Sequence, residues 1–152
     1  MKPDELGEGM RLRLDEQSFA VLSTLDAVGL PHSTIVCFCA ANHLATLAFV
    51  TPRTTRKFEN LRLHPDVTLF IDDRSNRMAD IKNIWGIEAR GRVREASDLE
   101  MPAYRDLFLT KYPTMEDFIL ADSSAICLLE VEKYDIVHRF QDVMHYVPDT
   151  SS

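Results

Sequence analysis

A short basic segment, Thr51-Pro52-Arg53-Thr54-Thr55-Arg56-Lys57, has the clearest potential for chemistry in this chain. It follows an apolar stretch and opens a helical pattern, so Arg56 and Lys57 fall in the first turn of a predicted helix. That turn carries a partial positive charge and unpaired N–H groups, which disfavour cations. A phosphate bound there would remove the conflict, because N–H groups, hydroxyls, a guanidinium and an ammonium all bind phosphate oxygens. The alternative is a solvated basic turn in which Arg56 or Lys57 pairs with Glu59 or another acidic neighbour.

Other reactive residue types form no recognisable site. No P-loop and no GxGxxG pattern occurs, so neither a triphosphate cradle nor a Rossmann site is supported. The five histidines lack the spacing of metal ligands, and no Ser-His-Asp or Cys-His arrangement is present. We read Asp72-Asp73 as a loop cap, and Glu130 and Glu132 as outward-facing strand residues. We therefore expect no metal and assign no catalytic residue.

Composition limits the compartment and the partners. The three cysteines, Cys37, Cys39 and Cys127, form no CxxC motif, which suits a reducing compartment, and Cys37 and Cys39 fit a buried strand face. A net charge of -7 argues against a nucleic-acid partner. No apolar run is long enough to span a bilayer, and the first residues do not resemble a signal peptide. We expect a cytoplasmic protein that contacts neither nucleic acid nor membrane.

The elements that must position the basic segment are short strands with a few helices between them. Residues 18–26 and 32–41 are rich in β-branched and aromatic side chains around a turn at Gly29 and Pro31, which predicts a hairpin. Asn42-His43 predicts a second tight turn. Further strands are predicted over 44–51, 66–73, 84–95 and 124–140, helices over 4–17, 54–63, 97–111 and 114–121, and a loop over 74–82.

This pattern predicts a mainly β (β+α) fold, a six-stranded antiparallel barrel with flanking helices. At 152 residues, the chain suits a single domain, which we place at 1–148 with a frayed tail at 149–152.

From Phe19 to Asp73 the sequence resembles the pyridoxamine 5'-phosphate oxidase-like superfamily of FMN-binding split barrels. The resemblance is carried by the Gly-x-Pro turn ending at Pro31, the strand His32–Val36 and the run Ala48–Lys57. It continues through Phe58–Phe70, where an Asn-Leu pair, a proline and alternating apolar residues match the family signature.

The resemblance implies an FMN cofactor at the interface of a homodimer. It implies that Arg56 and Lys57 bind the FMN phosphate with help from Thr55. It further implies isoalloxazine contacts from residues 34–36, and contacts to the ring and ribityl chain from residues 50 and 51. Two candidates further along are expected to contribute from the partner subunit, although Trp85 also fits an ordinary core or interface aromatic. These additional positions are Thr34, Ile35, Val36, Val50, Thr51, Asn76 and Trp85.

Three departures from the family pattern bear on the substrate. Thr34 stands where the vitamin B6 oxidases carry a phosphate-binding arginine, Gly86 stands near their flavin-contacting glutamine, and their C-terminal arginine and histidine separated by one residue are missing. We expect an FMN-dependent oxidoreductase acting on an unidentified small substrate or electron donor. The alternatives are a non-catalytic FMN-binding module for electron carriage, storage or stress response, and a relative that uses deazaflavin or haem.

Overall fold

One antiparallel sheet organises the chain, and the computed structural model describes residues 3–75, 77–139 and 142–150 of it. Within these residues the strand order is β2-β1-β5-β6-β7-β4-β3, with β8 paired to β7. The strands are β1 (Ala20–Leu25), β2 (Pro31–Val36), β3 (Phe38–Ala41), β4 (Thr46–Pro52), β5 (Asp66–Asp72), β6 (Trp85–Glu95), β7 (Ser124–His138) and β8 (Asp142–Tyr146).

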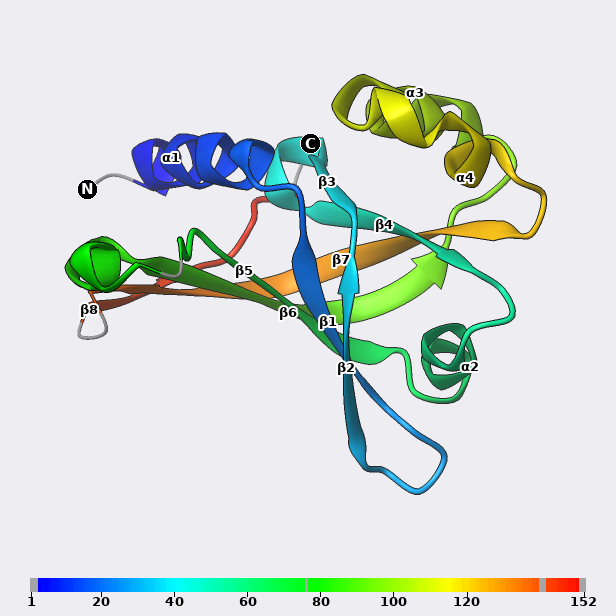
Figure 1. Cartoon of the computed structure of the whole chain (residues 1–152), viewed down its shortest axis with the longest axis horizontal. Coiled ribbons are helices and arrows are strands. Elements are labelled where there is room, and N and C mark those ends of the chain that lie inside the picture. Colours follow the sequence, from blue (N-terminus) through cyan, green and yellow to red (C-terminus); the bar gives the residue numbers. More distant parts are fainter. Residues whose placement is uncertain (1–2, 76, 140–141, 151–152) are drawn as a thin grey trace.

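The sheet curls into a half-barrel because its two end strands are neighbours in sequence. Strand β2 pairs with β1 and strand β3 pairs with β4, at opposite ends of the strand order. Cys37 alone separates them, so the chain itself connects both ends of the sheet (Figure 1). The predicted antiparallel split barrel with flanking helices is confirmed.

The predicted number of six strands is wrong, because the described residues contain eight. The predicted strand 32–41 breaks at Cys37, where the apolar alternation continues without a glycine or proline to signal the bend. Strand β8 follows β7 and was not predicted. Of the predicted strand 124–140, residues 124–138 form β7, Arg139 has a positive φ of 57° and Phe140 lies outside the described residues.

Helices cover the sheet on two sides and match the predicted ones within a few residues. Helix α1 packs beside β3, while α3 and α4 lie together on the other side, near β4 and β7 (Figure 1). The predicted loop 74–82 contains a short helical segment, η2. The helices are α1 (Pro3–Glu16), η1 (Asn42–Leu44), α2 (Arg56–Leu63), η2 (Met78–Asn83), α3 (Met101–Lys111), η3 (Pro113–Met115) and α4 (Glu116–Leu120).

Two hydrophobic clusters share strand β4. Leu47 and Phe49 point into the cluster enclosed by the sheet and α1, whereas Ala48 and Val50 point into the cluster under α3 and α4. Both faces of β4 are therefore buried, and the residues that follow it start from a fixed position. Among the described residues no helix is long and apolar enough to cross a membrane.

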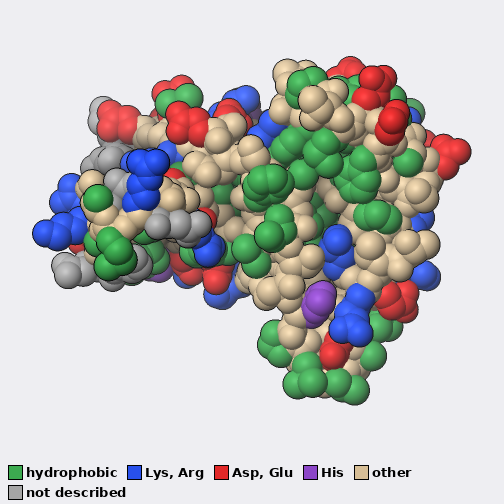
Figure 2. Space-filling model, viewed as in Figure 1, with side chains coloured by type: hydrophobic (Ala, Val, Ile, Leu, Met, Phe, Trp, Pro, Cys, Tyr) green, Lys and Arg blue, Asp and Glu red, His purple; other side chains and the backbone are tan. Residues whose placement is uncertain are grey.

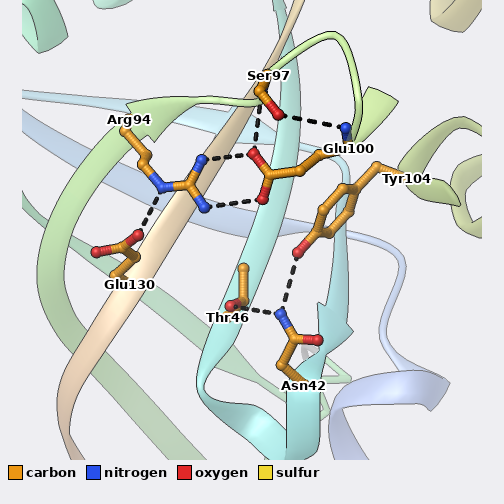
Figure 3. Close-up of polar contacts among 7 residues, drawn as sticks. All are labelled: Asn42, Thr46, Arg94, Ser97, Glu100, Tyr104 and Glu130. Carbon is orange, nitrogen blue, oxygen red and sulfur yellow. Dashed lines mark hydrogen bonds and ion pairs between the residues drawn. The ribbon is translucent and has the colours of Figure 1, made fainter. Parts of the chain in front are cut away.

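A polar network joins the start of α3 to the sheet (Figure 3). Arg94 on β6 donates from Nη1 and Nη2 to both carboxylate oxygens of Glu100, at 2.7 and 2.8 Å, and from Nε to Glu130 at 2.6 Å. Glu100 accepts from the backbone N–H of Ser97 at 3.0 Å, and Ser97 Oγ accepts from the Glu100 N–H at 3.3 Å. This reciprocal pair is a capping box, so the predicted helix start at Ser97 has a physical basis one turn before α3.

The predicted turn at Asn42-His43 is left-handed over three residues. Asn42, His43 and Leu44 have φ values of 51°, 53° and 71°. Asn42 Nδ2 donates to Thr46 Oγ1 at 3.1 Å and to Tyr104 Oη at 3.2 Å (Figure 3), and these partly buried bonds offset the cost of the turn.

Of the predicted tail, residues 149 and 150 are described and have no helix or strand, whereas 151 and 152 lie outside the described residues.

Candidate functional site

The turn from β4 into α2 is built around two threonine hydroxyls. Thr51 is fully buried, and its Oγ1 lies 3.0 Å from Thr55 Oγ1. Thr55 Oγ1 donates to Pro52 O at 2.9 Å and accepts from the Phe58 N–H at 3.3 Å, so Thr55 is the N-cap of α2. The cap sets the position at which the helix begins.

Arg56 and Lys57 occupy the first two positions of α2. Arg56 is exposed and Lys57 is half-buried. Within the part of the chain that the structure describes, neither side chain makes an ion pair or hydrogen bond, and the alternative pair with Glu59 is not formed. Two unpaired cations thus stand at the positive end of the helix dipole, beside N–H groups that have no intrahelical acceptor. This donor set fits a phosphate.

Arg53, the third cation of the segment, has different surroundings. Its Nη1 donates to the carbonyl oxygens of Asp122 at 3.0 Å and Ser124 at 2.9 Å, and its Nη2 pairs with Glu95. Its backbone N–H donates to Ser123 O at 2.8 Å. The guanidinium is therefore occupied by the protein.

A buried polar pair fixes the far end of α2 to the barrel. Asn60 Nδ2 donates to Thr24 Oγ1 at 3.1 Å, and both residues are buried. Thr24 was not predicted as a site residue, although a threonine at an inward position of an apolar strand is a usable signal.

Strand β2 presents its predicted residues at the edge of the sheet, and β2 also lies against β4. Ile35 is 66% exposed, Thr34 is half-buried and Val36 is buried. Figure 2 shows hydrophobic side chains gathered between α3–α4 and the β1–β2 hairpin, with Lys and Arg side chains, and some Asp and Glu side chains among them, below. An apolar surface and a charged corner are thus neighbours on this face.

Comparison with known proteins places this arrangement in a family. Residues 6–131 match the family model described as pyridoxamine 5'-phosphate oxidase. The chain belongs to the pyridoxamine 5'-phosphate oxidase family. The resemblance predicted from the basic segment and the strands around it is confirmed.

Solved structures with the same fold have varied functions. A haem-binding protein from Mycobacterium smegmatis aligns with a TM-score of 0.82 and 16% identity, over 93% of this chain and 57% of that one. An FAD-binding protein from Mesorhizobium loti aligns with a TM-score of 0.65 and 15% identity, over 82% and 88% of the chains. A Clostridium acetobutylicum protein related to general stress protein 26 aligns with a TM-score of 0.67 and 13% identity, over 95% of each chain.

The chain thus spans little more than half the length of the Mycobacterium smegmatis protein. No curated protein matches the sequence.

For this member of the family, the structure brings four predicted residues together at the β4–α2 turn: Thr51, Thr55, Arg56 and Lys57. The Val50 side chain instead points into the cluster under α3 and α4. Trp85 is 6% exposed within the core, donates its backbone N–H to Asp73 at 3.0 Å and lies under the Arg13 guanidinium. Asn76 lies outside the described residues.

Gly86, at the position near the family's flavin-contacting glutamine, is covered by another side chain. A Cβ added there would lie 2.7 Å from the Phe70 ring. Phe70 therefore covers the outer face of the sheet at this point, and it is 37% exposed.

The two described clefts lie away from these residues. One of about 360 Å³ lies between α1 and α3 and includes Lys111, and one of about 710 Å³ lies beside α1, His43 and Tyr146.

The cysteines are thiols rather than thiolates in this fold. Burial raises the pKa of both Cys39 and Cys127 to about 12, and burial also raises the pKa of Cys37. Reactive cysteines need a lowered pKa, so none of the three has the character of a nucleophile.

Proposed function

We propose that this chain binds flavin mononucleotide, with the phosphate held by Arg56 and Lys57 at the start of α2. The observation that carries the proposal is the pair of unpartnered cations on a helix N-terminus whose own cap, Thr55, is already formed. Within an acidic chain, such a pair is stabilised by a dianionic ligand.

The remaining predicted residues have different proposed parts. Thr34 and Ile35 would border the isoalloxazine ring along the edge of β2. Thr51, Val50 and Val36 would support the site from inside, since their side chains are buried. Trp85, also buried, would support the start of β6 from within the core. Asn76 stays a proposed contact from the partner subunit.

A homodimer would complete this site. Ile35 is exposed on an edge strand, and the hydrophobic group in Figure 2 adjoins the charged corner. Two copies meeting on this face would enclose a ring system that one copy leaves open. We retain the cytoplasm as the proposed compartment because all three cysteines are free thiols.

The proposed activity is that of an oxidoreductase on a small substrate. A bound flavin supplies two-electron redox chemistry, and the protein contributes binding, orientation and exclusion of water. The alternative is a binding module without turnover, for electron carriage, storage or stress response. Anaerobic mixing with NADH or NADPH separates the two, because rapid bleaching followed by transfer to an acceptor favours the enzyme.

The binding proposal is tested by fluorescence titration of the purified protein with FMN and with riboflavin, which lacks the phosphate. We expect FMN to bind at least about tenfold more tightly than riboflavin, because charge-assisted bonds contribute about 1.5–3 kcal/mol each. Equal affinities for FMN and riboflavin would refute the phosphate site, and a protein that binds neither ligand would refute the flavin proposal.

Haem is the second candidate, favoured by the similarity in fold to the Mycobacterium smegmatis haem-binding protein. A deazaflavin is a third cofactor that the same barrel would accept. The absorbance spectrum of the protein as purified, and its response to added haem or FMN, distinguishes the three chromophores.

A further inference from the structure

We propose that Arg53 is the positioning residue of the phosphate site: it fixes the β4–α2 turn so that Arg56 and Lys57 face one ligand, and it does not bind the phosphate itself. This inference rests on the proposed FMN-binding function. It divides three cations of one short segment into one structural residue and two ligand-binding residues.

The contacts of Arg53 span the turn. The guanidinium reaches the carbonyl oxygens of Asp122 and Ser124 at 3.0 and 2.9 Å, just before and at the start of β7, and it pairs with Glu95 at the end of β6. With the backbone bond to Ser123, these contacts tie residue 53 to two neighbouring strands. A planar guanidinium suits this task because its donors have fixed directions.

The expected effect of Arg53 on global stability is small. The Arg53 and Glu95 side chains are 40% and 41% exposed, and ion pairs at such positions contribute little. The β4–β7 ladder continues to the pair Pro52–Ser124 without the guanidinium. Loss of the Arg53 side chain therefore frees mainly the turn and the first residues of α2.

The other end of α2 would remain in place. Asn60 is hydrogen-bonded to Thr24 inside the protein, on the last turns of the helix. Loosening confined to the N-terminal end would displace Arg56 and Lys57 relative to the barrel. The loss of affinity should therefore fall mainly on the binding of the FMN phosphate.

Charge gives an independent criterion. Glu95 neutralises Arg53, which leaves two free cations near the ligand. Because salt screens charge–charge attraction, the salt dependence of FMN affinity reports how many cations the phosphate meets. Removal of a ligand-binding cation flattens that dependence, and removal of a positioning residue leaves it unchanged.

The test is titration of FMN and riboflavin at several salt concentrations with the wild type, Arg53→Gln, Lys57→Gln and Glu95→Gln. We expect Arg53→Gln to weaken FMN binding by about tenfold at every salt concentration, with riboflavin unaffected. Lys57→Gln should weaken FMN binding and flatten its salt dependence. Glu95→Gln, which retains the two carbonyl bonds of Arg53, should weaken FMN binding by no more than about twofold.

Three results would overturn the inference: wild-type FMN affinity in Arg53→Gln, a salt dependence flattened as in Lys57→Gln, or equal losses for FMN and riboflavin together with a lower Tm. If Arg53→Gln does not fold, Arg53→Lys takes its place, and it must show a smaller loss specific to FMN. A wild type that binds neither ligand refutes the proposed function itself, which separates that failure from a failure of the role of Arg53.

Discussion

At the scale of single residues, Arg53, Arg56 and Lys57 show that one sequence context gives different roles. Arg53 directly follows β4 and its side chain lies against the start of β7, where carbonyl oxygens occupy it. Arg56 and Lys57 come after the cap at Thr55, where the chain has turned away from β7. The turn over residues 53–55, before α2 begins, decides whether a cation contacts protein or solvent.

The first residue-scale prediction concerns the two free cations. The double substitution of Arg56→Ala and Lys57→Ala should cost several kcal/mol of FMN affinity, because each charge-assisted bond contributes about 1.5–3 kcal/mol. Riboflavin affinity and Tm should stay near the wild-type values. The matched control is Arg62→Ala, an exposed cation in the last turn of the same helix. The phosphate assignment is wrong if the control and the double variant bind FMN equally well.

At the scale of elements, local patterns were sufficient for most of the fold and for part of the site. Turn residues and apolar alternation predicted the hairpin, and the helical spacing of apolar residues over 54–63 predicted α2 to within two residues. The break at Cys37 was not predictable because it comes from strand pairing: β2 continues the sheet at β1, and β3 continues it at β4. The Asn60–Thr24 bond and the carbonyl partners of Arg53 are likewise long-range contacts that no local pattern contains.

An element-scale prediction concerns the start of α3. Hydrogen bonds from Arg94, then from the Ser97 backbone, lower the pKa of Glu100 from 4.5 to about 2. A depressed carboxyl pKa contributes stability that is fully present above the unfolded-state value and is lost as the pH falls through the folded-state value. Between pH 4.5 and 2 the wild type should therefore lose more stability than Glu100→Gln.

Urea unfolding across that pH range measures the difference, with Glu132→Gln as a control at an exposed position of β7. If the free energy of unfolding of Glu100→Gln followed the same pH dependence as the wild type, the carboxylate of Glu100 would make no contribution to stability in acid.

At the scale of the whole molecule, the chain exposes more surface than a compact monomer. Its accessible area is 9339 Å², whereas a compact monomer of this mass exposes about 7,900 Å². The β1–β2 hairpin stands away from the body in Figure 1 and accounts for part of the excess. The excess area is larger than the area of about 800 Å² that each partner buries in a standard interface, so it leaves room for a dimer interface of standard size.

We therefore expect sedimentation equilibrium to give twice the mass of 17.4 kDa. Ile35→Asp should shift the protein toward the monomer, because it places a charge on the apolar edge strand proposed for the interface. Leu99→Asp, a change at a 95% exposed apolar residue before α3, should remain dimeric. A wild type of single-chain mass at all concentrations would exclude the shared site.

The strand order also has a consequence for synthesis on the ribosome. Until β5 has been made, the nascent chain can form only two separate hairpins, β1–β2 and β3–β4, and isolated hairpins are marginally stable in water. Strand β4 gains its second neighbour only with β7, which is made after β5 and β6. The apolar faces that later enclose the core therefore stay exposed until β7 has been made, so we expect the emerging chain to depend on chaperones that hold unfolded segments.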